Sequence, residues 1–308
     1  MLINSGNMDG LFTGFKAAFN KGFEGAPSAY KTISMIVPSS ARSETYAWLG
    51  MLPRMREWIG DRIINNLQLH SYSITNRPFE QTIAVDRDDI EDDQYGVMTP
   101  LFAEMGRTAA EHPDQLIFDL LKTGFAAKCY DNQYFFDTDH PVATLTGEVS
   151  VSNTGGGSGE PWFLLDCSKM IKPMIYQERK PLGNLVSMDN PDDPNVFMRK
   201  QFLYGTEGRC NAGFGLWQLA YASKEPLTAE NYEAARQQMM TMTGDQGRKL
   251  GIKPTHLVCG PALEGEAMRL LNNGSRVVMV TNGADTVPLA LENEWKGTAT
   301  PIVTSWLA

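Results

Sequence analysis

The chain has 308 residues, of which 42% are hydrophobic and 20% charged, and its formal net charge is −9. These values are typical of a folded protein with about two domains and a sizeable core. The acidic balance argues against a dedicated nucleic-acid binder, because such a protein needs a basic face that displaces counterions from phosphates. Net charge is a global property, however, and does not exclude one local basic patch.

The four cysteines, Cys129, Cys167, Cys210 and Cys259, lie far apart and show neither zinc-ligand spacing nor a disulfide framework. We expect buried free thiols in a reducing compartment. The first residues, MLINSGNMDGLF, lack the basic region and apolar run of a secretory signal. No apolar run approaches the roughly 18 residues that span a membrane. The sequence therefore predicts an intracellular protein with no metal ion, no cofactor and no membrane contact.

Residues 1–45 are predicted to form an N-terminal arm rather than a domain. Phe12, Phe15, Phe19 and Phe23 recur at the spacing of one helix face. Glycines interrupt the same stretch, and each weakens the helix by about 1 kcal/mol relative to alanine. Such a helix is stabilised by docking, either on its own core or on a neighbouring subunit. We assign the four phenylalanines to a subunit interface.

Residues 46–66 show a helical pattern, interrupted by Pro53, and are predicted to be a helical connector. Residues 67–95 are predicted to be an extended loop, with a β-hairpin over residues 67–85 and a turn at residues 75–78. An isolated hairpin is marginally stable in water, so we expect this one to project and lie on another surface. Its predicted interface residues are Leu69, Tyr72, Ile74, Arg77, Phe79 and Ile83.

Six carboxylates between Asp86 and Asp93 precede a long amphipathic pattern. They lack the ligand order of a calcium loop, and acidic residues at this position favour the positive N-terminal end of a helix. The helix is predicted over residues 98–128, and Pro113 is expected to kink or divide it.

The segment DNQYFFDTDHP, residues 131–141, holds the most enzyme-like group of side chains. Asp137, Asp139 and His140 are conceivable metal ligands of a hydrolase. Consecutive residues on a strand or turn point apart, however, and no further histidine lies nearby in sequence. A structural turn is the favoured interpretation. The GGGSG run at residues 155–159 lacks the Gly-Lys-Ser/Thr of a phosphate loop.

Residues 189–221 are predicted to form an acidic loop, a short apolar strand, a Gly-Thr-Glu-Gly-Arg turn and a long strand with two apolar faces. Gly213 and Gly215 would let another backbone or helix approach this ribbon closely. Residues 226–308 alternate helical and strand patterns, beginning with a helix capped by Thr228, and predict a compact α/β unit.

Five stretches together resemble the major head subunit of Mu-like tailed bacteriophages. They are PRMREWIGDR (53–62), NRPFEQTIAVDRDDIEDDQYG (76–96), CYDNQYFFDTDHP (129–141), NVFMRKQFLYGTEGRCNAGFGLWQLAY (195–221) and GIKPTHLVCGPALEGEAMRLL (251–271). The resemblance spans nearly the whole chain in a constant order. It implies the α+β major capsid fold of tailed phages, of Hong Kong 97 type.

In that fold residues 1–45 would be the N-arm, residues 67–95 the extended β-hairpin loop and the long helix the spine. Residues 96–225 would be the peripheral domain and residues 226–308 the axial domain. In better-known members a strand pair of the VFMRKQF…GRCNAGFGL type comes late in the chain. Here it precedes the axial unit, so the chain order is rearranged.

The resemblance implies a structural protein and not an enzyme: a capsid subunit that self-assembles into hexamers and pentamers of an icosahedral head around double-stranded DNA. Implied partners are further copies of the chain, a portal, a scaffold or maturation protease, decoration proteins, and packaged DNA in non-specific contact. The implied location is the virion, after assembly in the bacterial host cytoplasm. Two alternatives stay open: a metal-dependent hydrolase using Asp137, Asp139 and His140, and a cellular compartment shell similar to encapsulins.

Overall fold

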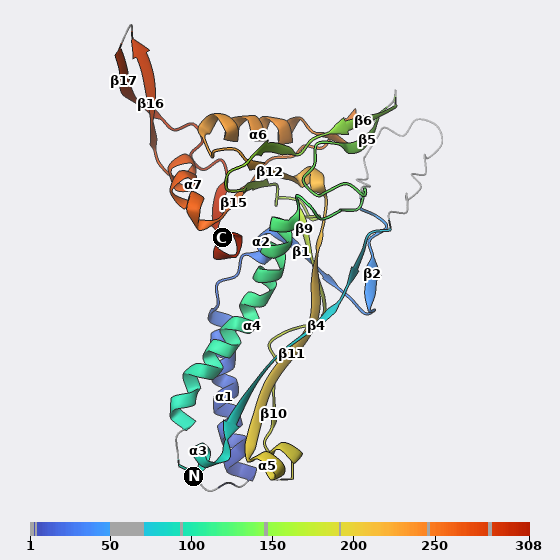
Figure 1. The fold of residues 1–308 in the computed structure, drawn as a ribbon, viewed down its shortest axis with the longest axis vertical. Coiled ribbons are helices and arrows are strands. Elements are labelled where there is room, and N and C mark those ends of the chain that lie inside the picture. Colours follow the sequence, from blue (N-terminus) through green and yellow to red (C-terminus); the bar gives the residue numbers. More distant parts are fainter. Residues whose placement is uncertain are drawn as a thin grey trace.

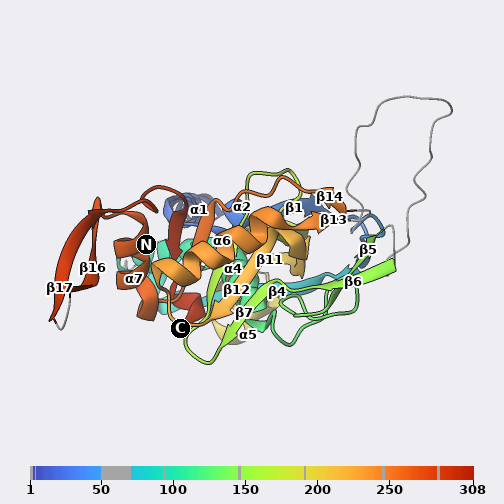
Figure 2. The same ribbon diagram turned by 90° about the horizontal axis from the view of Figure 1, so that it is seen from above.

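The computed structural model describes residues 3, 5–49, 71–92, 95–144, 147–190, 192–244, 247–282 and 285–308. They form an elongated leg with a broad body at one end (Figure 1). The leg holds two long helices, α1 (Ser5–Gly25) and α4 (Tyr95–Thr123), and most of a five-stranded sheet. The body holds a second five-stranded sheet and a two-stranded hairpin that projects from it (Figures 1 and 2).

The central strand of the leg is β11 (Gln201–Phe214), 14 residues long. Its first part pairs with β4 (Arg77–Asp86) and β10 (Leu185–Met188), and its last part pairs with β9 (Met174–Lys180). Strand β9 also pairs in parallel with β1 (Ser34–Pro38). The predicted Gly-Thr-Glu-Gly-Arg turn is wrong, because unbroken pairing with β4 holds this stretch extended and neither Gly205 nor Gly208 has a positive φ.

The sheet of the body has the strand order β18 (Thr300–Val303), β15 (His256–Cys259), β8 (Trp162–Leu165), β12 (Ala220–Lys224) and β7 (Thr154–Gly157). Helix α6 (Ala229–Thr241) starts at the predicted cap, where the Thr228 hydroxyl accepts the Asn231 N–H at 3.2 Å. The boundary expected between residues 225 and 226 does not separate two sheets, because three strands of this sheet precede it and two follow it.

The remaining helices are short: α2 (Tyr30–Ile33), α3 (Arg87–Glu91), α5 (Pro194–Arg199), α7 (Glu264–Leu271), and the 3-10 turns η1 (Trp217–Leu219), η3 (Pro261–Leu263) and η4 (Ser305–Leu307). Four two-stranded sheets complete the described part of the structure. They are β2 (Ser43–Thr45) with β3 (Ser73–Thr75), β5 (His140–Thr144) with β6 (Gly147–Val151), β13 (Thr243–Gly244) with β14 (Arg248–Lys249), and β16 (Ser275–Asn282) with β17 (Asp285–Glu292).

The β-hairpin expected over residues 67–85 is wrong in its pairing. Strand β3 pairs with β2, and β4 pairs along its whole length with β11. Between them the buried Asn76 does not make a turn; its side-chain amide donates to Ser39 Oγ at 2.8 Å and to the Ala41 carbonyl at 3.0 Å. The chain therefore crosses from one sheet to the other. Of the expected helical connector at residues 46–66, residues 50–66 lie outside the described residues, and residues 47–49 form a turn.

Both long helices follow the sequence pattern. Helix α1 contains the phenylalanine stripe, and α4 begins at Tyr95 and continues through Pro113 as one undivided helix of 29 residues. The two helices lie side by side and cover one face of β11, where buried and more exposed side chains alternate. Their shared core includes Phe15, Phe102 and Tyr204.

Two glycines set the distance between α1 and α4. A Cβ atom at Gly22 would lie 1.8 Å from the carbonyl oxygen of Ala103, and one at Gly106 would lie 2.0 Å from that of Phe19. The backbones are therefore in direct contact, which leaves the ring of Phe15 stacked on Phe102 at 4.0 Å. Gly22, one of the residues expected only to weaken α1, is required by this packing.

We predict that Gly22→Ala lowers the free energy of unfolding by about 1–3 kcal/mol, the usual cost of overpacking, since the new methyl meets backbone that has no room to move. Gly14→Ala is the matched control in the same helix, because nothing lies within 4 Å of its added Cβ. It should stabilise by about 1 kcal/mol through helix propensity. Urea denaturation of both variants checks this, and equal effects would contradict the packing role.

Candidate functional site

The three residues singled out as metal ligands do not form one site. The Asp137 carboxylate accepts the backbone N–H groups of Tyr134 (3.1 Å) and Thr138 (2.8 Å). Asp139 is exposed, whereas His140 is fully buried. A hydrolytic centre built on Asp137, Asp139 and His140 is therefore not supported by the geometry.

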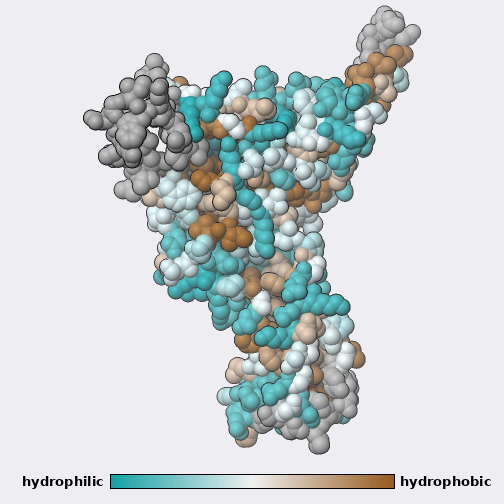
Figure 3. Space-filling view, turned by 180° about the vertical axis from the view of Figure 1, so that it is seen from behind, coloured by the Kyte–Doolittle hydropathy of each residue, from teal (hydrophilic) through white to brown (hydrophobic). Residues whose placement is uncertain are grey.

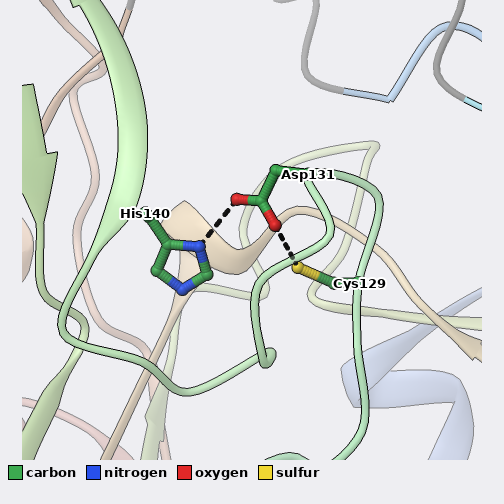
Figure 4. Close-up of side chains that lie close together, drawn as sticks. All are labelled: Cys129, Asp131 and His140. Carbon is green, nitrogen blue, oxygen red and sulfur yellow. Dashed lines mark hydrogen bonds and ion pairs between the residues drawn. The ribbon is translucent and has the colours of Figure 1, made fainter. Parts of the chain in front are cut away.

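His140 instead belongs to a buried cluster with Cys129 and Asp131 (Figure 4). Its Nδ1 lies 2.7 Å from one Asp131 carboxylate oxygen, and the Cys129 thiol donates to the other at 3.0 Å. The imidazole also stacks on Trp217, with ring centroids 3.9 Å apart. The sequence analysis missed Cys129 and Asp131, although both fall within the conspicuous CYDNQYFFDTDHP segment.

The electrostatics of the cluster are those of a structural hydrogen-bond unit. Burial alone would raise the pKa of Asp131, but hydrogen bonds from His140 and Cys129 hold it below its usual value. Burial raises the pKa of the Cys129 thiol, so it stays protonated and is a poor nucleophile. Among the described residues this is the one group of three donors close enough to hold a metal ion, and both Asp131 oxygens are already occupied by hydrogen bonds.

We predict that Asp131→Asn destabilises the fold by about 1.5–3 kcal/mol at neutral pH, the value of a hydrogen bond to a charged group. Because the folded-state pKa is lowered, the carboxylate stabilises above the unfolded-state pKa, and this contribution is lost as pH falls through the folded-state value. The difference between wild type and variant in urea melts should therefore shrink below about pH 4. The exposed Asp139→Asn is the control and should stay within about 0.5 kcal/mol at every pH.

Part of the predicted arm interface lies in the chain's own core. Phe15 and Phe19 are 2% and 0% exposed between α1, α4 and β11, so their assignment to a subunit interface is wrong. Phe12 and Phe23 are partly buried against the same cluster, where they stack on Tyr204 and Phe19. The helix docks within its own subunit because the glycine contacts with α4 give it a fitted surface there.

Several residues of the predicted hairpin interface also serve the internal fold. Ile74 is buried over Gly213, where an added Cβ would lie 2.1 Å from its Cδ1, so its assignment to a subunit interface is wrong. The Tyr72 hydroxyl accepts the Phe214 N–H at 2.7 Å. Close approach at Gly215 is confirmed as well, since its Cβ would lie 2.2 Å from the Lys172 carbonyl oxygen.

The other hairpin residues lie on β4. Ile83 is partly buried against the leg core. The rings of Phe79 and His112 pack edge to face with their centroids 4.2 Å apart, and the exposed Arg77 lies over Phe79 at 5.4 Å from the ring centroid. Phe79 also lines an open cavity of about 230 Å³ between β4, α4 and the C-terminal turn, so Arg77 and Phe79 stay predicted interface residues. Leu69 lies outside the described residues.

Large apolar side chains are exposed at both extremities of the protein. At the end of the leg these include Val97 (82% exposed) on α4 and Phe197 (81%) and Met198 on α5. On one side of the body the projecting β16–β17 hairpin carries Val277, Val287, Leu289 and Leu291, and Figure 3 shows brown surface on the coloured part of this projection.

The hairpin exposes one aliphatic stripe. Val278 lies opposite Leu289 and Arg276 opposite Leu291, which places Val278, Val287, Leu289 and Leu291 on one face. The sequence analysis noted only short strands here. The signal that would have found the hairpin is the aliphatic alternation on both sides of Asn282-Gly283, a dipeptide typical of hairpin turns.

Among the described residues, no helix combines the length and apolar character needed to cross a membrane. Known proteins similar to this chain are phage head proteins. The major capsid protein of Escherichia phage Mu is 45% identical over the full length of both chains. The Mu-like prophage FluMu major head subunit of Haemophilus influenzae is 44% identical, over 93% of this chain and 92% of its own.

Solved structures agree with this relationship. The procapsid of bacteriophage JBD30 contains a chain that is 42% identical, with a TM-score of 0.84, and the match covers 99% of this chain and 100% of that one. A JBD30 capsid decorated with minor capsid protein trimers matches with a TM-score of 0.71 at 32% identity, over 92% of both chains. These likenesses confirm the α+β tailed-phage capsid fold.

The family described as Mu-like prophage major head subunit gpT matches residues 8–307. With the full-length similarity to phage Mu and the capsid fold, this match shows that the chain belongs to the major head subunits of Mu-like phages and is a structural capsid protein rather than an enzyme.

Proposed function

We propose that copies of this chain associate into rings of six and of five, which close an icosahedral head around double-stranded DNA. The observation that carries the proposal is the exposure of large apolar side chains at opposite ends of one elongated subunit. Exposed apolar groups scattered singly are normal, whereas groups gathered on projecting elements mark interaction sites.

The arrangement suits ring formation. A contact around a rotation axis is heterologous, so each subunit must present two different surfaces. The hairpin of the body is one such surface, and the region of Arg77, Phe79 and the neighbouring cavity is a candidate for another. Repeated contacts of about 1,600 Å² are sufficient for stable association without covalent bonds.

Further partners follow from the same role. A head of this kind needs a portal, a scaffold or maturation protease, and in some phages decoration proteins, and it assembles in the cytoplasm of the bacterial host before it becomes part of the virion. The JBD30 capsid with minor capsid protein trimers supports decoration as a property of a similar protein.

We predict that the double substitution Leu289→Ser and Leu291→Ser impairs assembly while the melting temperature stays within about 2 °C, because both side chains are exposed in the single subunit. Sedimentation and negative-stain microscopy report assembly, and thermal melting reports folding. Met240→Ser on α6 is the control, since it also removes an exposed apolar side chain but leaves the hairpin intact. Normal shells from the double variant would exclude the hairpin as an assembly contact.

We further predict that Phe15→Ser with Phe19→Ser unfolds the leg rather than selectively blocking assembly. Large-to-small core substitutions of aromatic residues cost about 3–5 kcal/mol each, and both rings are buried inside the subunit. Loss of the cooperative thermal transition is the expected result. An unchanged transition with failed assembly would return these residues to the interface.

A further inference from the structure

Five lysines lie on three separate segments that contact one another near the surface. They lie on α2, on the loop between β8 and β9, and on β14 with the loop that follows it; this lysine patch consists of Lys31, Lys169, Lys172, Lys249 and Lys253. The Lys172 ammonium donates to the Thr32 carbonyl at 2.8 Å, and that of Lys169 donates to the Leu250 carbonyl at 3.1 Å. These bonds hold the three segments together.

The ammonium groups of the patch are not paired with carboxylates. Within the described parts of the chain, none of the five ammonium groups forms an ion pair with a carboxylate. Asp166 and Asp114 contact the same segments, but both are buried and accept backbone N–H groups. The net positive charge also affects His256, whose pKa is lowered by burial and further by Lys172. The described part of a chain with net charge −9 therefore includes a basic area.

The patch is open to solvent on one broad side of the molecule. Lys31, Lys249 and Lys253 are exposed, and Met170, between the two loop lysines, is 92% exposed. Viewed from above, α1, α2 and β14 lie along one side of the protein, and β4 and β7 along the other (Figure 2). The lysine patch and the long arm helix thus share a side.

We propose that the lysine patch binds the phosphate backbone of packaged double-stranded DNA, and that the side carrying α1, α2 and β14 faces the inside of the head. The inference rests on the proposed function and assigns the face that meets the genome. Lysine ammonium groups act as point charges toward phosphate, whereas the arginine forks that read bases are not needed for non-specific contact. The acidic remainder of the chain limits the grip on DNA.

The first test uses the purified, unassembled subunit and a fluorescent 20-base-pair duplex, with binding measured by anisotropy across a salt titration. The variant combines Lys31→Gln, Lys249→Gln and Lys253→Gln; Lys169 and Lys172 are kept because their backbone hydrogen bonds hold the loops. Loss of three phosphate contacts should reduce the slope of log K against log[NaCl] by about 2.7, at about 0.9 per contact. The control combines Lys128→Gln, Lys200→Gln and Lys296→Gln, three exposed lysines outside the patch whose replacement changes the net charge by the same amount. Its slope should stay at the wild-type value.

The second test compares assembled wild-type shells with the same amount of free subunits. Closed shells should bind added duplex more weakly, because the patch then faces inward.

Equal slopes for the two triple variants, or shells that bind added DNA as tightly as free subunits, would overturn the inference. The inference would also be overturned if poly-glutamate bound the patch more tightly than DNA of equal charge, because that result would indicate an acidic protein partner. Negative-stain microscopy tests the proposed function separately. Wild-type subunits that form neither shells nor rings would contradict that proposal and leave the DNA contact of the free subunit untouched.

Discussion

Backbone contact between α1 and α4 is the constraint on which the leg of this protein depends. Gly22 and Gly106 each face a carbonyl oxygen of the opposite helix, so the two axes approach more closely than side chains with a Cβ would allow. At this distance Phe15 and Phe102 stack, and both rings meet Tyr204 of β11 in T-shaped contacts. Two helices and a narrow sheet thereby share one core, although neither layer is wide enough to bury its apolar face alone.

Strand β11 carries that core into the body. It is paired along its length by β4, β10 and β9, and it ends at Phe214. The next residue, Gly215, lies against the Lys172 carbonyl. The following turn places Trp217 on the imidazole of His140. The cluster of Cys129, Asp131 and His140 thus fixes the segment after α4 to the junction of leg and body. Both carboxylate oxygens of Asp131 are engaged, one by Cys129 and one by His140, which gives an enzyme-like set of residues a structural role here.

The surfaces left over after folding differ in character. Apolar side chains are exposed at the two extremities, where copies of a long subunit can meet, and lysines collect on one broad side. The internal docking of the arm helix moves the proposed subunit contacts from the phenylalanine stripe to the β16–β17 hairpin and to the region of Arg77 and Phe79. Because the proposed sites for self-association and for phosphate contact are separate, substitutions in one surface do not disturb the other.

The sequence by itself determined the features that depend on neighbours along the chain. Helices α1, α4 and α6, with the cap at Thr228, follow from apolar periodicity and capping, because helix hydrogen bonds join residues four apart. The motif order was likewise enough to indicate the capsid family. Only the tertiary structure decided which strands pair. Strand β4 pairs with β11, more than a hundred residues away, and not with its neighbour β3. It also decided that Phe15 and Phe19 are internal and that His140 pairs with Asp131 rather than Asp137. An aromatic stripe or a carboxylate in the sequence shows that a partner is needed, but not where in the folded chain that partner lies.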